Sequence, residues 1–154
     1  MIWPPDSPWS PWWRTNDKAI RQAFKLANLN SKDLIYDLGC GDGKTLVIAA
    51  KEFDAHAIGI EIDPLRFWIA KFLILFTGLS DKVQVRRENF LKSDFSDASV
   101  IFVYLVPKAL QRLLPQFKKL KKGTRIVSIN YEAPLKEIRS INHKGKYRIH
   151  LYRI

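Results

Sequence analysis

Cysteine is nearly absent from this chain of 154 residues, which contains only Cys40. A single cysteine excludes an intramolecular disulfide framework and is consistent with a reducing compartment, so we expect a cytoplasmic protein. The three histidines, His56, His143 and His150, are scattered along the chain. No Cys/His cluster has the spacing of metal ligands, so we expect no metal site.

Long apolar runs are also missing. Residues 1–13 hold four tryptophans and four prolines, and the run is too short and too interrupted for a signal peptide or a membrane span. A second apolar stretch, 67–76, is interrupted by Lys71 and is too short to cross a bilayer. We expect it to form a helix that packs against a sheet and is apolar on more than one face.

Acidic residues are few compared with basic ones, 15 against 26, which gives a formal net charge of +11. The imbalance is concentrated at the end of the chain: residues 118–154 carry 11 basic and 2 acidic residues, a net charge of +9. Such a region favours an acidic partner, namely nucleic acid, an anionic membrane or an acidic protein surface. A solvated surface that keeps the protein in solution explains the charge equally well.

The length is that of one domain and leaves no room for a separate substrate domain. Any target must therefore dock on the domain itself. We divide the chain into a Trp/Pro-rich N-terminal segment, residues 1–15, and a single domain, residues 16–154.

The most informative stretch is 36–45, in which a glycine-rich turn follows an apolar strand and opens an apolar helix. Gly39, Gly41 and Gly43 allow a sharp turn and let a ligand lie against the main chain at the start of the helix. Nucleotide-dependent dehydrogenases use a related turn, so the glycines alone do not identify the ligand. Cys40 within the turn is explained better as a small residue in a tight space than as a nucleophile.

Two later positions specify the ligand further. Glu61 ends a second strand-like run, where a carboxylate accepts both hydroxyls of a ribose, and Asn89-Phe90 follows a third run with a polar and an aromatic group suited to adenine. Asp37, at the end of the first strand, can pair with an ammonium group, and Ile62 with Phe90 can enclose the adenine ring. An acid, a glycine turn, a second acid and an adenine pocket, in this order, fit S-adenosylmethionine (SAM).

With these motifs, Asp-Leu-Gly-Cys-Gly-Asp-Gly at 37–43, Gly-Ile-Glu at 59–61 and Asn-Phe at 89–90, the chain resembles the class I SAM-dependent methyltransferases. The resemblance runs from about Thr15 to the C-terminus. More narrowly, the compact chain and Tyr-Leu-Val-Pro at 104–107 resemble the small seven-strand protein lysine methyltransferases. These include archaeal broad-specificity enzymes and mitochondrial enzymes that act on the ATP synthase c-subunit and the adenine nucleotide translocase.

The resemblance implies an α/β, Rossmann-like fold with a seven-stranded, mostly parallel sheet, a C-terminal antiparallel hairpin and helices on both faces. We expect helices over 18–28, 44–53, 64–77 and from Pro107, where Pro115 starts a new turn or kinks the helix. Expected strands cover 34–38, 58–61, 82–86, 99–104, 125–129, 138–141 and 147–152.

The resemblance also implies the roles of site residues. The segment before the first helix folds over the cofactor in this family, and the target is met at Tyr104. We therefore expect Tyr104, Trp12 and Trp13 to line a channel for a lysine side chain through cation–π contacts, whereas core packing explains Tyr131 better. The expected cofactor-binding residues are Thr15, Asp37, Leu38, Gly39, Cys40, Gly41, Gly43, Glu61, Ile62, Asn89 and Phe90.

Three functions remain open from the sequence. A protein lysine methyltransferase is favoured. An RNA methyltransferase would use the basic C-terminal region, but the chain lacks the Asn/Asp-Pro-Pro-Tyr/Phe motif of enzymes that methylate amino groups of bases. A non-catalytic SAM-binding protein is the third. For the N-terminal tryptophans, a lid over the cofactor, packing onto the core and peripheral contact with a membrane interface all remain open.

Overall fold

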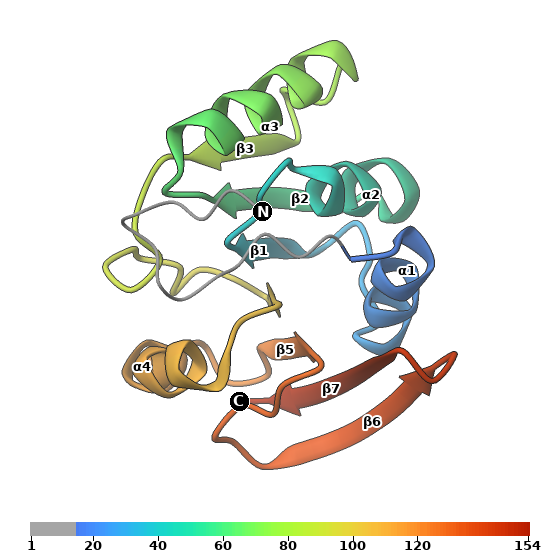
Figure 1. The fold of residues 1–154 in the computed structure, drawn as a ribbon, viewed down its shortest axis with the longest axis vertical. Coiled ribbons are helices and arrows are strands. Elements are labelled where there is room, and N and C mark those ends of the chain that lie inside the picture. The colour runs from blue at the N-terminus through green and yellow to red at the C-terminus, as the bar shows by residue number, and fades with distance from the viewer. Residues whose placement is uncertain (1–14) are drawn as a thin grey trace.

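A seven-stranded sheet with helices on both faces forms the body of the protein (Figure 1). The structure is a computed structural model, and it describes residues 15–154. The strands follow the order β3-β2-β1-β4-β5-β7-β6 across the sheet. Their bounds are β1 Leu34–Leu38, β2 His56–Ile60, β3 Val83–Arg86, β4 Val100–Val103, β5 Arg125–Ile129, β6 Glu137–His143 and β7 Tyr147–Arg153.

The first five strands are parallel and the last two are antiparallel. All four residues of β4 are buried, as expected for a central strand covered on both faces. The β6–β7 hairpin continues the sheet beyond β5 at the far edge from β3 (Figure 1). The predicted fold is therefore confirmed, with strand bounds that shift by one or two residues.

Polar caps and prolines set the starts of the helices. Asn16 caps α1 (Asp17–Leu26) by accepting a hydrogen bond from the Lys18 amide at 2.8 Å. Asp63 caps α3 (Pro64–Phe76) in the same way through the Arg66 amide, also at 2.8 Å. Gly43 precedes α2 (Lys44–Phe53), and α4 (Pro107–Phe117) begins with a proline at its first position.

The sequence predicted that Pro115 starts a new turn or kinks the helix, and the structure shows that α4 continues through this residue. A proline inside a helix removes one backbone hydrogen bond. Pro115 lies on the exposed side of α4, two residues before the helix ends. Water can replace the lost bond there, so the helix tolerates the proline.

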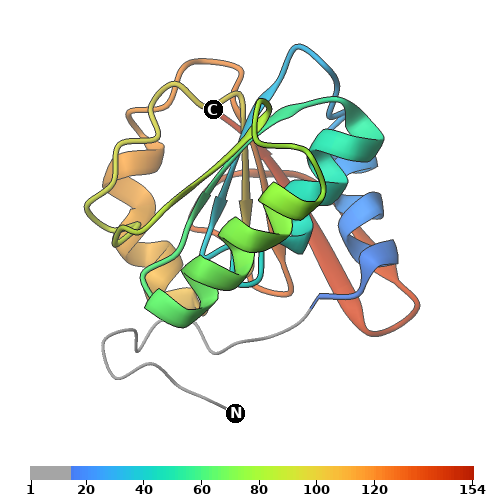
Figure 2. The same cartoon turned by 90° about the horizontal axis from the view of Figure 1, so that it is seen from above.

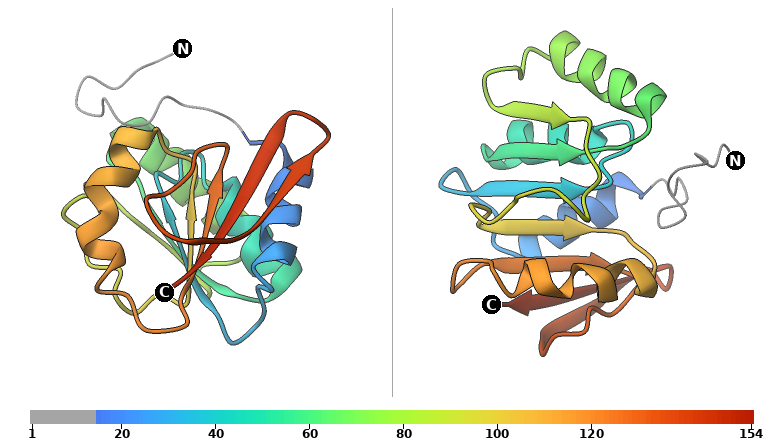
Figure 3. Two further views of the ribbon diagram at one scale, coloured as in Figure 1. Left: turned by 90° about the horizontal axis from the view of Figure 1, so that it is seen from below. Right: turned by 90° about the vertical axis from the view of Figure 1, so that its left-hand side faces the viewer.

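Two apolar clusters sandwich the sheet. One contains buried residues of α1, α2 and α3 together with alternate strand residues such as Phe102, and the other contains buried residues of α4 with Val103. Seen from above, α4 lies on one side of the sheet and α1 and α2 lie on the other (Figure 2). The view from below shows the β6–β7 hairpin leaning past α1 (Figure 3).

An ion pair fastens the amino ends of two central strands. Asp33, just before β1, pairs with Arg125 at the start of β5, and both side chains are largely buried. Ser99 donates a hydrogen bond to the same Asp33 carboxylate at 2.8 Å, and Arg125 donates to the Ala27 carbonyl at 2.6 Å. This network ties α1, β1 and β5 together at the amino ends of the strands.

Within residues 15–154, none of the helices combines the length and the apolar character that a membrane crossing requires.

Candidate functional site

The polar residues predicted from the sequence gather at the carboxyl ends of the parallel strands. Asp37 is the fourth residue of β1, and in register it lies between Gly59 of β2 and Phe102 of β4. Glu61 immediately follows β2, and Tyr104 immediately follows β4. Ligands of open α/β sheets bind at this edge, where neighbouring strands diverge.

Three amides of the glycine turn after β1 donate to backbone carbonyls within the protein. The Gly39 and Cys40 amides both donate to the Ile60 carbonyl, at 2.8 and 3.0 Å, and the Gly43 amide donates to the Cys40 carbonyl at 3.0 Å. We expected the turn amides to approach the ligand, whereas these three fasten the turn to β2 and close it on itself. A ligand can therefore pack against the backbone of the turn, but these three amides are not available to donate hydrogen bonds to it.

Glycines at two positions permit close packing around the turn. A Cβ on Gly59 would lie 2.6 Å from both Cys40 Sγ and Leu46 Cδ1. A Cβ on Gly43 would lie 3.0 Å from the Cβ of Ala70 in α3, and the backbone of Gly43 has a φ of +84°. The pKa of the buried Cys40 thiol is raised, first by burial and then by nearby Asp37 and Glu61. A protonated thiol in a tight space agrees with a packing role for Cys40.

Two hydrogen bonds hold the Glu61 carboxylate in place, and it can still accept further hydrogen bonds from a ligand. One carboxylate oxygen accepts the Gly41 amide at 2.9 Å and the other accepts the Asp63 amide at 3.0 Å. Each carboxylate oxygen has two lone pairs, so each can accept one more hydrogen bond. A pair of ribose hydroxyls matches this remaining capacity. Burial raises the pKa of Glu61, and the two amide hydrogen bonds partly offset that effect.

Asp37 is a buried acid beside this carboxylate. Burial, and next the negative charge of Glu61, raise its pKa to about 8, although a hydrogen bond with Thr45 acts in the opposite direction. A cation next to Asp37 would favour the ionised carboxylate. The ammonium group of SAM supplies such a charge, so the environment of Asp37 fits the predicted ligand.

The predicted adenine residues differ in how much surface they leave for a ligand. Phe90 is buried in the cluster beneath α4, and the side-chain amide of Gln116 in α4 donates to its carbonyl at 3.1 Å. Ile62 and Asn89 are half-buried, and Asn89 Oδ1 accepts the Leu91 amide at 3.0 Å. Phe90 therefore packs mainly against the core, and Ile62 keeps more of its side chain accessible.

Tyr104 belongs to a cluster of tyrosines at the ends of β4 and β5. Its ring centroid is 6.5 Å from that of half-buried Tyr131, and its hydroxyl accepts a hydrogen bond from Asn130 Nδ2 at 2.9 Å. Asn130 is itself fixed by exchanging hydrogen bonds with the backbone of Arg148 on β7, at 2.6 and 2.9 Å. Burial raises the pKa of Tyr104, so its hydroxyl stays protonated at neutral pH.

Sequence reasoning missed Asn130 and assigned Tyr131 to the core. The only available signal for Asn130 was its place directly after the fifth strand, at the same edge as the other site residues. Asn130 has a φ of +65°, a conformation that asparagine adopts more readily than most residues. The backbone conformation of Asn130 and its side-chain hydrogen bond together indicate that it supports Tyr104.

The start of α1 lies close to these tyrosines. The Asn16 amide donates to the Tyr147 hydroxyl at 3.3 Å, and Tyr147 influences Tyr104 electrostatically. Thr15, half-buried, is the residue before this contact. Trp12 and Trp13, the other predicted members of the site, lie outside the residues that the structure describes.

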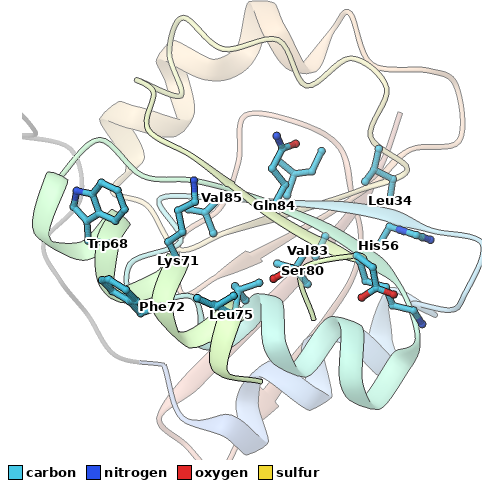
Figure 4. A pocket seen from close by; sticks show the side chains of 15 residues that line it. Leu34, His56, Trp68, Lys71, Phe72, Leu75, Ser80, Val83, Gln84 and Val85 are labelled. Atoms are coloured by element: carbon cyan, nitrogen blue, oxygen red, sulfur yellow. The ribbon is translucent and has the colours of Figure 1, made fainter. Parts of the chain in front are cut away.

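A groove of about 680 Å³ runs along α3 and β3, away from the glycine turn (Figure 4). Its labelled side chains include Trp68, Phe72 and Leu75 of α3 and Gln84 of β3. None of the glycines 39–43 and neither Glu61 nor Tyr104 lines it. It is therefore separate from the predicted cofactor and target sites.

One group of side chains in residues 15–154 has the proximity of metal ligands. Donor atoms of Glu132, Glu137 and His150 lie within 4.8 Å of one another, and His150 Nδ1 contacts a Glu137 oxygen at 2.5 Å. The two acids are exposed, and a cation would have to displace the His150–Glu137 contact. The absence of a metal therefore stays a prediction.

Comparison with known proteins is consistent with this geometry. The model of the ANTKMT methyltransferase domain matches residues 37–139. A protein-lysine N-methyltransferase of Saccharolobus islandicus is 35% identical over 134 residues, which cover 86% of this chain and 81% of that protein. A human lysine N-methyltransferase of the ATP synthase c-subunit is 24% identical over 118 residues, 76% of this chain and 50% of that protein. The chain thus spans about half the length of the human relative.

Among solved structures, an RNA methyltransferase from Salinibacter ruber in complex with S-adenosyl-L-homocysteine superposes with a TM-score of 0.88. The two sequences are 30% identical, and the match covers 92% of this chain and 94% of the other. A putative methyltransferase from Escherichia coli has a TM-score of 0.75 at 16% identity, over 93% of this chain and 88% of that one, and supports the fold alone.

Proposed function

The chain belongs to the family of the ANTKMT methyltransferase domain, and on that basis we propose that it transfers a methyl group from SAM to the ε-amino group of lysine in a protein substrate. The observation that carries the proposal is the pairing of two sites at one sheet edge. A buried acid pocket, Asp37 and Glu61, adjoins the glycine turn, and an aromatic cluster around Tyr104 follows β4.

The residues of the acid pocket fit SAM part by part. Glu61 keeps two acceptor positions for the ribose hydroxyls while the Gly41 and Asp63 amides fix its orientation. Asp37 meets the ammonium group, directly or through water. Ile62 and Asn89 border the adenine.

The remaining groups of the site suggest how the lysine is handled. SAM supplies a methyl group on a sulfonium, which a neutral amine takes by in-line displacement. Tyr104 keeps its proton at neutral pH because its pKa is raised, so its hydroxyl does not act as a base. Its ring and that of Tyr131 instead desolvate the amine and disfavour its charged form. Trp12 and Trp13, which lie outside the described residues, stay predicted members of this channel.

The test is to incubate the protein with SAM labelled in its methyl group and with separate protein and RNA fractions of the source cells. Label in protein, recovered as methylated lysine after hydrolysis, supports the proposal. Label confined to RNA would support the second candidate, which the likeness to the Salinibacter ruber RNA methyltransferase and the basic C-terminal region favour. Glu61→Ala serves as the control with reduced activity at limiting SAM, because loss of charge-assisted ribose contacts should weaken SAM binding by about 1.5–3 kcal/mol.

A further inference from the structure

The helix α3 carries an apolar stripe on its outer surface. We define the stripe as six side chains that are between 40% and 83% exposed: Leu65, Trp68, Ile69, Phe72, Leu75 and Phe76. Among the described residues, Ile138 is the only other large apolar side chain that is exposed to this extent. The inner surface of α3 packs on the sheet through different residues, namely Phe67, Ala70 and Ile74.

The spacing of the stripe is that of a helix-packing seam. Leu65, Trp68, Phe72 and Leu75 follow one another at intervals of three, four and three residues, the pattern of the a and d positions in packed helices. Trp68 and Phe72 lie with ring centroids 6.1 Å apart, and Phe72 and Phe76 with centroids 6.4 Å apart. The rings thus form a continuous ridge along the helix, beside the groove that borders β3 (Figure 4).

We propose that the stripe is a homodimer interface, in which α3 of one copy packs against α3 of a second copy about a two-fold axis. Six side chains of this size present roughly 600–800 Å² of apolar surface, more than the largest patch of about 300–600 Å² on a typical monomer. A stable interface of standard size buries about 800 Å² on each partner. The stripe with its groove therefore offers the area that a dimer requires.

The distribution of charge also favours a second copy. Lys71 is the only exposed charged residue of α3, because Arg66 is buried. The region of net charge +9, residues 118–154, includes β5, β6 and β7 and so lies toward the opposite edge of the sheet from α3 and β3. Six strand spacings separate β3 from β6, roughly 29 Å, which exceeds the screening length of about 8 Å at physiological salt. Two copies joined at α3 hold their basic ends apart.

Two other occupants fit the stripe less well. A helix that lies on a bilayer carries Lys and Arg along its polar face, whereas this surface carries a single lysine. The first 13 residues contain four prolines, and proline is unfavourable inside a helix, so by sequence this segment is a poorer match to a helical seam. A second copy supplies the same seam by symmetry.

The experiment measures the mass of the protein by sedimentation velocity between 1 and 100 µM, concentrations on the order of those at which modest interfaces assemble. We expect a species of twice the 17.9 kDa of the chain, with a fraction that grows with concentration. Phe72→Glu should shift the protein to the monomer. The matched control is Ile138→Glu, which places the same charge at a similarly exposed apolar residue on β6 and should leave the dimer intact. Unchanged SAM binding and a cooperative thermal transition show that both variants are folded.

Disulfide trapping adds an independent readout. Ile69→Cys places a thiol in the stripe, and we expect oxidation to give a covalent dimer that Ile138→Cys does not give. Native Cys40 is buried and does not compete. A wild-type monomer at every concentration, whether or not it sediments with anionic vesicles, overturns the proposal. A dimer that survives Phe72→Glu and resists trapping through Ile69→Cys also overturns it.

Discussion

Asp37 is the residue at which stability and ligand binding conflict. The folded protein raises the pKa of Asp37 from its ordinary value of 3.8 to about 8 by burying it beside Glu61. Between pH 3.8 and about pH 8, the Asp37 carboxyl keeps a proton in the folded chain and loses it in the unfolded chain. The contribution of Asp37 to stability therefore falls as the pH rises from about 4 to about 8.

We predict that Asp37→Asn stabilises the protein in the absence of SAM at pH 8 and weakens its binding of SAM. The amide keeps the shape of the side chain and has no charge to bury, so the melting temperature should rise, by about 2–4 °C for each 1 kcal/mol gained. Loss of the partner of the ammonium group should weaken SAM binding about tenfold or more. Thermal melts at pH 5 and pH 8 and calorimetry measure both effects. The control is Asp81→Asn, at an exposed acid, which should change neither the melting temperature nor SAM binding. A lower melting temperature of Asp37→Asn at pH 8 would contradict the prediction.

The second prediction concerns proton removal from the lysine amine. Tyr104 remains protonated and the lysine has an ordinary pKa of about 10.4, so the rate at saturating SAM should climb from neutral into alkaline pH without a plateau near pH 7. Tyr104→Phe keeps the ring and should retain more activity than Tyr104→Ala. A profile that is flat above pH 7, with Tyr104→Ala fully active, would place the target channel elsewhere.

The third prediction separates the side chain of Asn130 from its backbone. Glycine adopts the φ of +65° at this position without strain, whereas it cannot donate to the Tyr104 hydroxyl or accept from the Arg148 amide. We expect Asn130→Gly to lower kcat/KM for the protein substrate several-fold while SAM affinity stays unchanged, because Asn130 positions Tyr104 and does not adjoin the acid pocket. Steady-state kinetics with both substrates decide this. A loss of SAM affinity equal to the loss of activity would show a general structural role.

At the scale of elements, the two ends of the strands have separate tasks. The amino ends of β1 and β5 are fastened by Asp33 and Arg125, whereas the carboxyl ends present the acid pocket and Tyr104. Packing of the whole sheet joins the two ends. A substitution at the amino ends can therefore change stability without removing a residue of the acid pocket.

We predict that Asp33→Ala lowers the free energy of unfolding by about 3 kcal/mol, because it leaves the largely buried Arg125 guanidinium without its partner. The Kd for SAM should remain within a factor of two at a temperature where the variant is folded. Urea denaturation and calorimetry measure the two quantities. The control is Glu52→Ala, which breaks the exposed pair with Arg21 and should change stability far less than Asp33→Ala does. Equal losses in the two variants would contradict a special role for the buried pair.

At the scale of the whole molecule, charge is distributed unevenly along the sheet. Lys118, Lys119, Lys121 and Lys122 follow α4 and precede β5, in the region of net charge +9. The predicted cofactor-binding residues lie in the part of the chain between Thr15 and Phe90. We therefore predict that the basic region docks an acidic target and contributes little to SAM binding.

Neutralising these four lysines should raise the KM for the protein substrate and flatten its dependence on salt, with little effect on the Kd for SAM. The matched control neutralises four exposed lysines of the remaining chain: Lys18, Lys25, Lys32 and Lys51. Kinetics at increasing salt concentrations distinguish the two sets. If both variants keep the salt dependence of the parent protein, the basic region is only a solvated surface.

The sequence by itself predicted the fold, and it named the acids and glycines that the structure brings to one edge of the sheet. Glycines at 39, 41 and 43, the acids at 37 and 61 and the caps Asn16 and Asp63 act through their immediate neighbours, and local conformational preferences can be read from residue types and spacing. The continuous apolar run of β4 likewise indicated a central strand, because a strand covered on both faces must be apolar on both. The antiparallel hairpin at the end of the chain turns at Lys144-Gly145, where both residues have a positive φ, and such a turn between two strand-like runs is typical of a hairpin.

Only the tertiary structure decided which residues meet across long separations in the sequence. The bond between Asn130 and Tyr104, the contact of Tyr131 with Tyr104, and the pairing of Asp33 with Arg125 join residues from different strands and loops. The apolar run of α3 is visible in the sequence, yet only packing showed which of its two faces is buried and which is exposed. Burial and long-range contact depend on how the whole chain is folded, and local sequence does not contain that information.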